Sequence, residues 1–422
     1  MIVLFFLFFV LIAIGFPIAI AIGLSAIVSL KYYGYPLIVI AQKMVTGIDS
    51  FTFIAIPLFI LAGELMNVGK ITDKIFNFAK AIVGWIPGGL AHANVVASVI
   101  FAGMSGSAIA DAGGLGVVEM KAMRDAGFDD EFSSAVTAAS STIGPIFPPS
   151  IPFVIYGGIA SVSVGKLFLG GVIPGLAMMA ALMIMIFFYA LNNRYPRTRF
   201  SLCELGGEFV KAIIPLLTPI IILSGFVIGL FTPTEASAVA VFYALLVGGL
   251  LYREISLKKL MNALKNTAVS SANVVFIIGT ATLFSFILTN EGFTEIIAER
   301  LFSISEDPIL VLLIINLVLF LLGMIMEPGA ILIMMLPILL PIVEHLALDY
   351  VHFGVMMILN LMIGQVTPPF GMCLFTISQV GGVSLHRLFR AIIPFIFPLV
   401  FVLLLTLFIP EIVTWLPDLL MK

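Results

Sequence analysis

The sequence predicts an all-α membrane protein built from two inverted repeats. Three observations lead to this fold class: the apolar composition, a motif that occurs twice, and a one-sided distribution of basic residues. Apolar residues make up 61% of the 422 positions and charged residues only 10%, and the mean hydropathy is +1.23. Soluble domains carry about 25% charged residues. We therefore expect a chain that crosses a lipid bilayer many times.

A short motif in the first half returns 220 residues later. Residues 143–149 read IGPIFPP and residues 363–369 read IGQVTPP. Gly103-Met104 likewise returns as Gly323-Met324. Because proline removes a backbone donor and clashes with the preceding turn, each Pro-Pro pair predicts a break in a membrane helix. Broken helices at matching positions of two repeats indicate the binding site of a secondary transporter.

Apolar stretches of about 20 residues predict the crossings of the bilayer. We expect them at residues 2–30, 51–68, 131–160 (broken), 168–193, 209–231, 233–251, 267–288, 352–379 (broken) and 388–413. Two further stretches, 88–122 and 308–346, are interrupted by Ser105-Gly106-Ser107 and Glu327-Pro328-Gly329. Irregular backbone at membrane depth occurs only where it is buried in protein or lines a cavity. We therefore expect both stretches to be re-entrant hairpins.

Basic residues gather on one side of this topology. With the N-terminus in the cytoplasm, all but five of the 20 Lys and Arg residues are cytoplasmic, as the positive-inside rule requires. The five outside are Lys31, Lys43, Lys166, Arg300 and Lys422. The two hairpins then open to opposite sides, so the repeats are inverted. The amphipathic pieces 36–47 and 255–266 are too short to cross and are expected to lie flat at the interface.

The first break and the first hairpin tip predict a cation site. A helix that stops at Gly144 exposes its last carbonyl groups, which form a partially negative end. Carbonyl oxygens suit a sodium ion, whereas the free N–H groups of the next half-helix suit a substrate carboxylate. The predicted ligands of the first site are Ser105, Gly144, Phe147 and Pro149. The second repeat predicts an equivalent site from Gly323, Gly364, Thr367 and Phe370, where Thr367 adds a hydroxyl ligand. Two or more sodium ions are thus expected, and no organic cofactor.

Polar residues near the same breaks are candidates to contact a substrate. They are Ser107, Asp111, Thr142, Ser150 and Glu327. Carboxyl groups inside apolar stretches are functional candidates because their burial is costly. Two structural alternatives stay open, because Asp111 could cap a helix or lie near a wet mouth, and Glu327 could cap the half-helix that follows it.

At these residues the chain resembles the large membrane subunit of the tripartite ATP-independent periplasmic (TRAP) transporters, within the ion transporter superfamily. The matching stretches are Gly103–Gly116, Gly144–Gly157, Thr232–Ala236, Met326–Pro341 and Gly364–Gly371. The resemblance implies an elevator-type transporter in the bacterial inner membrane, with sodium coupling and an organic acid as substrate. It also implies two partners, a small four-helix membrane subunit and a periplasmic substrate-binding protein.

The resemblance divides the chain into four parts. Residues 1–87 are scaffold helices with an interfacial arm, and residues 88–193 are one half of a transport domain, with the first hairpin and broken helix. Residues 194–307 are a linker and the scaffold helices of the second repeat. Residues 308–422 are the other half of the transport domain, with the second hairpin, the second broken helix and the last helix.

Other classes of protein remain as alternatives. A carrier of the same superfamily could take up carboxylates alone, coupled to sodium or protons. A channel would contain an open polar pore, which two separate mid-membrane breaks do not suggest. An intramembrane serine protease could use Ser105 in Gly103-Met104-Ser105-Gly106, but it needs a nearby histidine. The four histidines, at 92, 345, 352 and 386, lie near predicted membrane edges. The sequence contains no P-loop pattern, and a net charge of −3 gives no indication of nucleic-acid binding.

Overall fold

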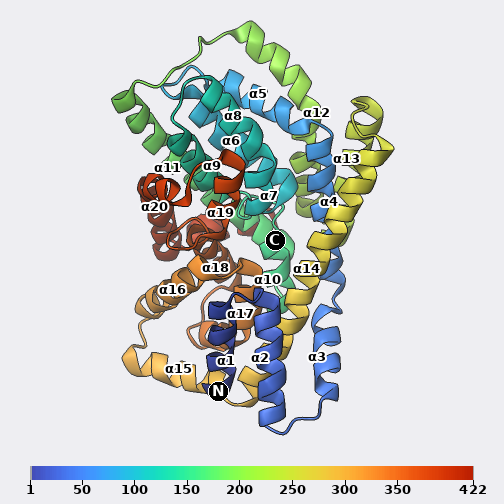
Figure 1. Cartoon of the computed structure of the whole chain (residues 1–422), viewed down its shortest axis with the longest axis vertical. Helices are drawn as coiled ribbons and strands as arrows, with labels where there is room; N and C mark the ends of the chain where they lie inside the picture. Colours follow the sequence, from blue (N-terminus) through green and yellow to red (C-terminus); the bar gives the residue numbers. More distant parts are fainter. Residues whose placement is uncertain (1, 422) are drawn as a thin grey trace.

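The computed structural model describes residues 2–421, apart from the side chains of Ile2 and Ser105, and this described part contains helices and no strand. The first half is coloured blue to green in Figure 1. Its helices are α1 (Ile2–Ile14), α2 (Ile18–Tyr32), α3 (Ile38–Ile48), η1 (Phe51–Ile54), α4 (Ala55–Val68), α5 (Ile71–Val83), α6 (Gly89–Ser105), α7 (Ala108–Gly113), α8 (Leu115–Asp125), α9 (Asp130–Ser141), α10 (Ile151–Ala160) and α11 (Val164–Asn193).

From α15 onward, the second half repeats the order of the elements α5 to α11 of the first half. Its helices are α12 (Leu202–Val227), α13 (Pro233–Leu245), the π-helical turn η2 (Leu246–Leu251), α14 (Leu257–Asn290), α15 (Phe293–Ile304), α16 (Pro308–Ile325), α17 (Pro328–His345), α18 (Tyr350–Gly364), α19 (Met372–Gly381), α20 (Leu385–Phe408) and α21 (Glu411–Leu420). Hairpin 1 is α6–α8 and hairpin 2 is α16–α17. In Figure 1 hairpin 1 lies at the upper end with α5, and hairpin 2 at the lower end with α15, as inverted repeats require.

Both predicted breaks are present. The first broken helix consists of α9 and α10, separated by residues 142–150, and the second consists of α18 and α19, separated by residues 365–371. The Pro148-Pro149 and Pro368-Pro369 peptide bonds are both cis. The sequence-based prediction of breaks in 131–160 and 352–379 is therefore confirmed.

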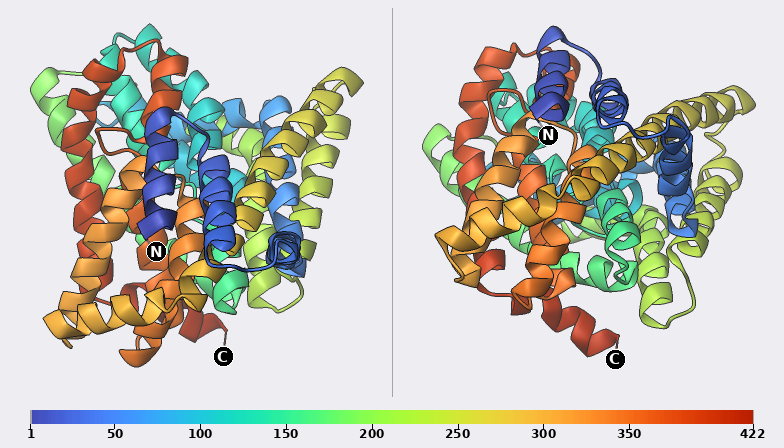
Figure 2. Two further views of the ribbon diagram at one scale, coloured as in Figure 1. Left: turned by 60° about the horizontal axis from the view of Figure 1, so that its bottom comes forward. Right: turned by 90° about the horizontal axis from the view of Figure 1, so that it is seen from below.

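The predicted single crossing over residues 2–30 is wrong. The helix ends at Ile14 and restarts after Pro17, which has no N–H to continue the hydrogen-bond ladder. The two pieces pack against each other, and Figure 2 shows them side by side as a helical hairpin. The ring centroid of Phe5, on α1, lies 5.1 Å from that of Phe293, the first residue of α15. The start of α1 is thus at the same end of the molecule as α15.

The amphipathic piece predicted at residues 255–266 is not a separate segment, whereas the flat position predicted for residues 36–47 stays a prediction. Residues 257–266 are the first turns of α14, a continuous helix of 34 residues and about 50 Å. The helix α3 packs on the second half of α14. There the Lys43 Nζ lies 4.5 Å from the centroid of the Phe286 ring. Nothing between residues 257 and 290 breaks the helix, since that stretch holds no proline.

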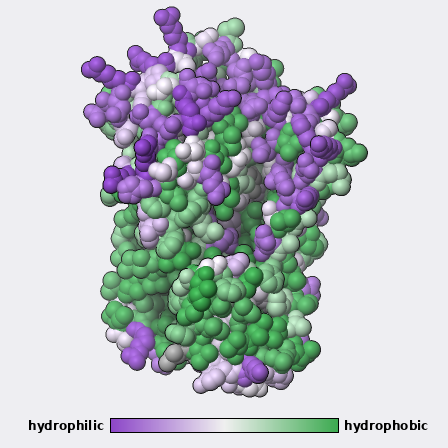
Figure 3. All heavy atoms as spheres, viewed as in Figure 1, coloured by the Kyte–Doolittle hydropathy of each residue, from purple (hydrophilic) through white to green (hydrophobic). Residues whose placement is uncertain are grey.

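Eight of the helices in the described part are long and apolar enough to cross a membrane. Figure 3 shows a broad hydrophobic surface with a hydrophilic cap at the upper end. The helices α4, α13 and α14 pack together as one group. In a second group the two repeats interleave, because α10 packs on α17, α7 on α19 and α9 on α20. This interleaving brings both breaks to the centre of the molecule.

Candidate functional site

A cavity of about 610 Å³ lies where the two helix groups meet. Its walls come from α4 and α14 on one side and from the two hairpin tips, the start of α10 and the end of α18 on the other. The polar wall residues on α4 and α14 are Glu64, Asn67, Ser270 and Asn273. Those on the opposite wall are Ser107, Glu327 and Gln365. The described residues of the wall include two carboxyl groups and no Lys, Arg or His.

The tip of hairpin 1 is bonded directly to the first break. The Ile151 N–H, at the start of α10, donates to the carbonyl oxygen of Gly106 over 3.3 Å. Gly106 has a φ of +61°, and a methyl group added there would lie 2.7 Å from the carbonyl oxygen of Pro149. Only glycine allows this close approach of two backbones. The break thus places the predicted ligand Pro149 at the hairpin tip beside Ser105, whose side chain lies outside the described part. Phe147 is half-buried within the same break.

The second break is built in the same way. A methyl group added at Gly364 would lie 2.8 Å from the Cα of Gly323, so these two backbones are in contact. The Gly371 N–H donates to the Met324 carbonyl oxygen over 3.0 Å, which ties the end of α16 to the start of α19. The Thr367 hydroxyl donates to the Ile363 carbonyl oxygen over 2.7 Å, and the lone pairs of its own oxygen remain available to a cation. Three of the four predicted ligands of the second site therefore lie together, while the side chain of the fourth, Phe370, is 50% exposed.

Asp111 belongs to the first break rather than to the cavity wall. A methyl group added at Gly144 would lie 2.3 Å from Asp111 Oδ2, so the carboxyl group packs on the predicted cation ligand Gly144. Asp111 is only 2% exposed. Nearby, the Ser141 Oγ and the Cys373 Sγ are 3.2 Å apart, which joins α9 to α19. A direct substrate contact by Asp111 gains no support from this geometry, because α7 turns the residue inward.

Thr142 and Ser150 also lie behind the cavity wall. The Thr142 hydroxyl donates to the Ala139 carbonyl oxygen over 2.6 Å, within its own helix end. Ser150 caps α10, since its Oγ accepts from the Phe153 N–H over 3.2 Å, and it donates to the Pro145 carbonyl oxygen. Both side chains are fully buried. Their predicted substrate contacts gain no support either, because neither residue lines the cavity.

Ser107 and Glu327 do line the cavity, and both are helix caps. Ser107 accepts from the Ala110 N–H over 3.4 Å at the start of α7. Glu327 accepts from the Ala330 N–H over 3.1 Å at the start of α17. The capping role that the sequence left open for Glu327 is therefore confirmed. A substrate contact by either residue stays a prediction.

Sequence reasoning missed the polar residues on α4 and α14. Ser270, Asn273 and Ile277 recur at helical spacing and share the face of α14 that lines the cavity. A signal was present, because polar side chains on one face of a membrane helix point toward protein or a cavity. Gln365, inside the second motif, was overlooked in favour of its neighbours.

Residues 5–412 match the sequence model of a family described as "Tripartite ATP-independent periplasmic transporter, DctM component". The chain belongs to this family. The resemblance to TRAP transporters drawn from the paired motifs is therefore confirmed, and the chain is a large TRAP permease subunit. Family membership and the apolar helices together make it a multi-pass inner-membrane protein.

Several TRAP permeases are similar over nearly the whole chain. The sialic acid TRAP transporter large permease protein SiaM of Vibrio cholerae is 46% identical over 380 residues, which cover 90% of this chain and 89% of SiaM. The C4-dicarboxylate TRAP transporter large permease protein DctM of Vibrio cholerae is 36% identical, with 97% and 95% covered. The 2,3-diketo-L-gulonate permease YiaN of Escherichia coli is 36% identical, with 95% of each chain covered. These relatives are transporter subunits, which speaks against the protease alternative.

A solved structure supports the fold alone. The YdaH transporter of Alcanivorax borkumensis, described as having an unusual topology, superposes with a TM-score of 0.61 over 88% of each chain. The sequence identity is 13%, so this TRAP permease shares an architecture with YdaH, and the likeness says nothing of substrate.

Proposed function

We propose that the chain carries out sodium-coupled secondary active uptake of an organic acid by an elevator mechanism. The observation that carries this proposal is the central cavity, at which both hairpin tips and the start of α10 meet α4 and α14. The relatives transport sialic acid, C4-dicarboxylate or 2,3-diketo-L-gulonate, which favours an organic acid as substrate. A periplasmic binding protein would deliver it, and a small four-helix membrane subunit would complete the complex.

The charge of the cavity supports cation coupling. Its described wall contains Glu64 and Glu327 and no basic side chain. A carboxylate substrate that enters such a wall is repelled unless positive charge accompanies it. Helix starts such as that of α10 supply partial positive charge. Sodium ions held by the carbonyl groups of the two breaks would supply full charges beside the substrate.

The packing supports a division into scaffold and transport domain. The group of α4, α13 and α14 corresponds to the predicted scaffold parts within 1–87 and 194–307. The interleaved group corresponds to 88–193 together with 308–422. A substrate held between the two groups is exposed to either side when one group slides past the other, which is alternating access around one site.

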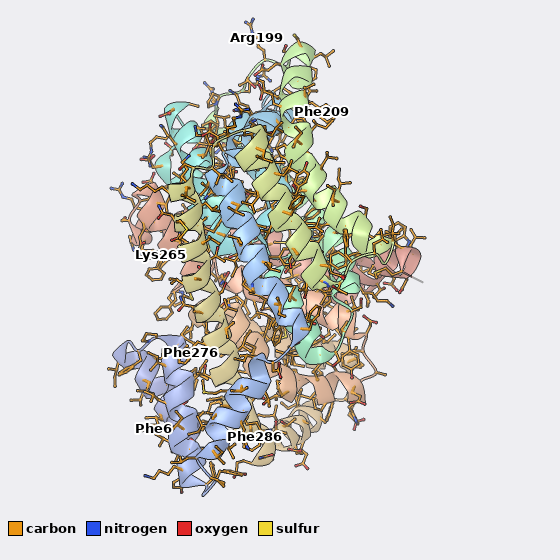
Figure 4. All side chains as sticks on the ribbon, turned by 90° about the vertical axis from the view of Figure 1, so that its right-hand side faces the viewer. Phe6, Arg199, Phe209, Lys265, Phe276 and Phe286 are labelled. Carbon is orange, nitrogen blue, oxygen red and sulfur yellow. The ribbon has the colours of Figure 1, made fainter. Side chains whose placement is uncertain are left out.

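The distribution of basic residues suggests an orientation. Figure 4 places Arg199 at the upper end and Phe6, on α1, near the lower end. With the basic upper end in the cytoplasm, the start of α1 faces the periplasm. This orientation reverses the cytoplasmic N-terminus expected from a single first crossing, because α1 and α2 form a hairpin.

Uptake into proteoliposomes tests the function. The chain would be reconstituted with its small membrane subunit and binding protein, and sialic acid and a C4-dicarboxylate would serve as the first probes. We expect uptake of an organic acid under an inward sodium gradient and none when potassium replaces sodium. Uptake that is indifferent to sodium and follows a proton gradient would favour the alternative carrier. Flux without any accumulation against a gradient would favour a channel.

A further inference from the structure

Each repeat joins its hairpin to its broken helix through a buried asparagine. We propose that Asn94 in the first repeat, and Asn316 with Asn360 in the second, are positioning residues that hold the ends of α9 and α18 in the geometry that binds cations. This inference rests on the proposed sodium coupling.

In the first repeat the bonds run from α6 to α9. The Asn94 Nδ2 donates to the Thr137 Oγ1 over 2.7 Å, and the Ser140 hydroxyl donates to the Asn94 Oδ1 over 2.6 Å. The Thr137 hydroxyl in turn donates to the Ser133 carbonyl oxygen over 2.8 Å. Asn94, Thr137 and Ser140 are at most 1% exposed. One amide side chain thus uses both its ends to fix the last turns of α9 against hairpin 1.

In the second repeat the bonds run from α18 to α16. The Asn360 Nδ2 donates to both the side-chain and the main-chain oxygen of Asn316, over 2.7 Å and 2.9 Å. The Asn316 Nδ2 donates to the Leu312 carbonyl oxygen over 2.8 Å. Asn360 is 1% exposed and Asn316 is 6% exposed. Asn360 stands 220 residues after Ser140, the same offset that separates Gly144 from Gly364.

The position of these bonds explains why they matter to a cation. Ser140 precedes the end of α9 by one residue, and Asn360 lies one helical turn before Gly364. The proposed ligands are largely main-chain oxygens, which move only when the half-helix moves. A binding site works when its groups are held within about 0.5 Å of the productive geometry. A hydrogen bond to the last turn, deep in an apolar interior, restricts both sliding and rotation of the half-helix.

A purely stabilising role would not need polar groups here. Polar side chains in a membrane interior are costly, and helices there pack well through small or apolar residues. In both diverged repeats a buried asparagine bonds the hairpin to the broken helix, at the corresponding positions Ser140 and Asn360 of the broken helices, which is more consistent with a demand for exact register. If register is the purpose, apolar replacement can restore stability without restoring cation affinity.

The test follows thermal unfolding of the full chain in lipid nanodiscs against sodium, with potassium keeping the ionic strength constant. The variants are Asn360→Leu, the pair Asn316→Leu with Asn360→Leu, Ser140→Ala, and the pair Asn94→Leu with Ser140→Ala. The matched control is Ser25→Ala, because Ser25 is equally buried but donates only within its own helix, to Ile22. Should a double variant fail to fold, Ser140→Ala and the additional variant Asn360→Ala replace it, because they only remove atoms. Their sodium affinity is then compared with that of the wild type and the control.

We expect the sodium concentration at half-maximal stabilisation to rise about tenfold in the variants and to stay unchanged in the control. We also expect the double variants to unfold near the wild-type temperature when no sodium is present. When sodium is added, we expect their unfolding temperature to respond only weakly. Variants that bind sodium like the wild type would overturn this inference alone. A wild type with no sodium response would overturn both this inference and the proposed sodium coupling.

Discussion

Thr367 is the predicted side-chain ligand whose surroundings in the structure most favour a cation. Its hydroxyl donates to the Ile363 carbonyl oxygen, so the lone pairs of the hydroxyl oxygen point away from the helix. We expect Thr367→Ala to weaken sodium affinity by about ten- to a hundredfold, since a hydrogen bond or ligand to a charged group contributes about 1.5–3 kcal/mol. The measurement is the sodium dependence of uptake.

A second threonine gives the control for this variant. Thr406 is fully buried on α20, and its hydroxyl donates to the Val402 carbonyl oxygen over 2.9 Å, one turn back in its own helix. Thr406→Ala removes the same atoms and should leave sodium affinity unchanged. Equal losses in both variants would mean that Thr367 acts through helix stability and is no ligand.

Gly364 tests the contact between hairpin 2 and the second break. Its added methyl group would lie 2.8 Å from the Gly323 Cα, and backbone cannot move aside as a flexible side chain can. We expect Gly364→Ala to destabilise the protein by about 1–3 kcal/mol and to reduce sodium affinity. Gly206→Ala on α12, where nothing lies within 4 Å, is the control and should be neutral or slightly stabilising. Normal sodium binding by Gly364→Ala would show that the two backbones do not form a cation site.

Residues with a distinctive local pattern could be predicted, and residues without one could not. The motif placed Gly323, Gly364 and Thr367 together correctly because proline and glycine leave a clear signal of a broken helix. Asn273 and Ser270 gave only the weaker signal of polar side chains on one face of an unbroken helix, and the tertiary packing was needed to show what that face contacts. The substrate contact predicted for Asp111 gained no support, since the short α7 sets the direction of the side chain and the sequence does not reveal that turn.

At the scale of elements, the two broken helices are the features on which the function depends. Replacing Pro148 and Pro149 with alanine restores two backbone donors and removes two helix-breaking rings. We expect this double variant to lose at least nine-tenths of uptake while remaining folded, because α9 and α10 would tend to join and cover the carbonyl groups of the break. Uptake at the wild-type rate would contradict the broken-helix account. Pro174→Ala in α11, where the helix runs through the proline, is the control.

The first crossing shows what apolar length alone cannot decide. Residues 2–30 contain enough apolar residues for one span, yet Pro17 divides them into a hairpin. The second repeat carried the answer, because Pro233 begins α13 after the end of α12, much as Pro17 directly precedes α2. The opposite error occurred at residues 255–266, where amphipathic character suggested a separate piece but no breaker interrupts α14. Helix breaks were thus predictable where the sequence was compared between repeats.

At the scale of the whole molecule, alternating access requires the two helix groups to move past each other. Asn67 on α4 faces Gly114 in hairpin 1, and a methyl group added at Gly114 would lie 3.1 Å from the Asn67 Nδ2. We expect the pair Asn67→Cys and Gly114→Cys, in a Cys203→Ser background, to stop uptake under oxidising conditions. A reductant should restore uptake. Continued transport by the fully cross-linked protein would rule out sliding at this interface.

The inversion of the repeats was predictable from charge, because the positive-inside rule constrains every loop at once. The interleaving of α10 with α17 and of α7 with α19 was not predictable, since it depends on how two separate sequence segments pack. That interleaving is what brings both breaks to one cavity.

The central claim is that the two breaks bind sodium, and equilibrium binding of radioactive sodium to the purified chain tests it most directly. We expect at least two saturable sites, from which unlabelled sodium displaces the label and potassium does not, and we expect Thr367→Ala to weaken one of them. No saturable binding, or binding that potassium displaces equally well, would contradict it.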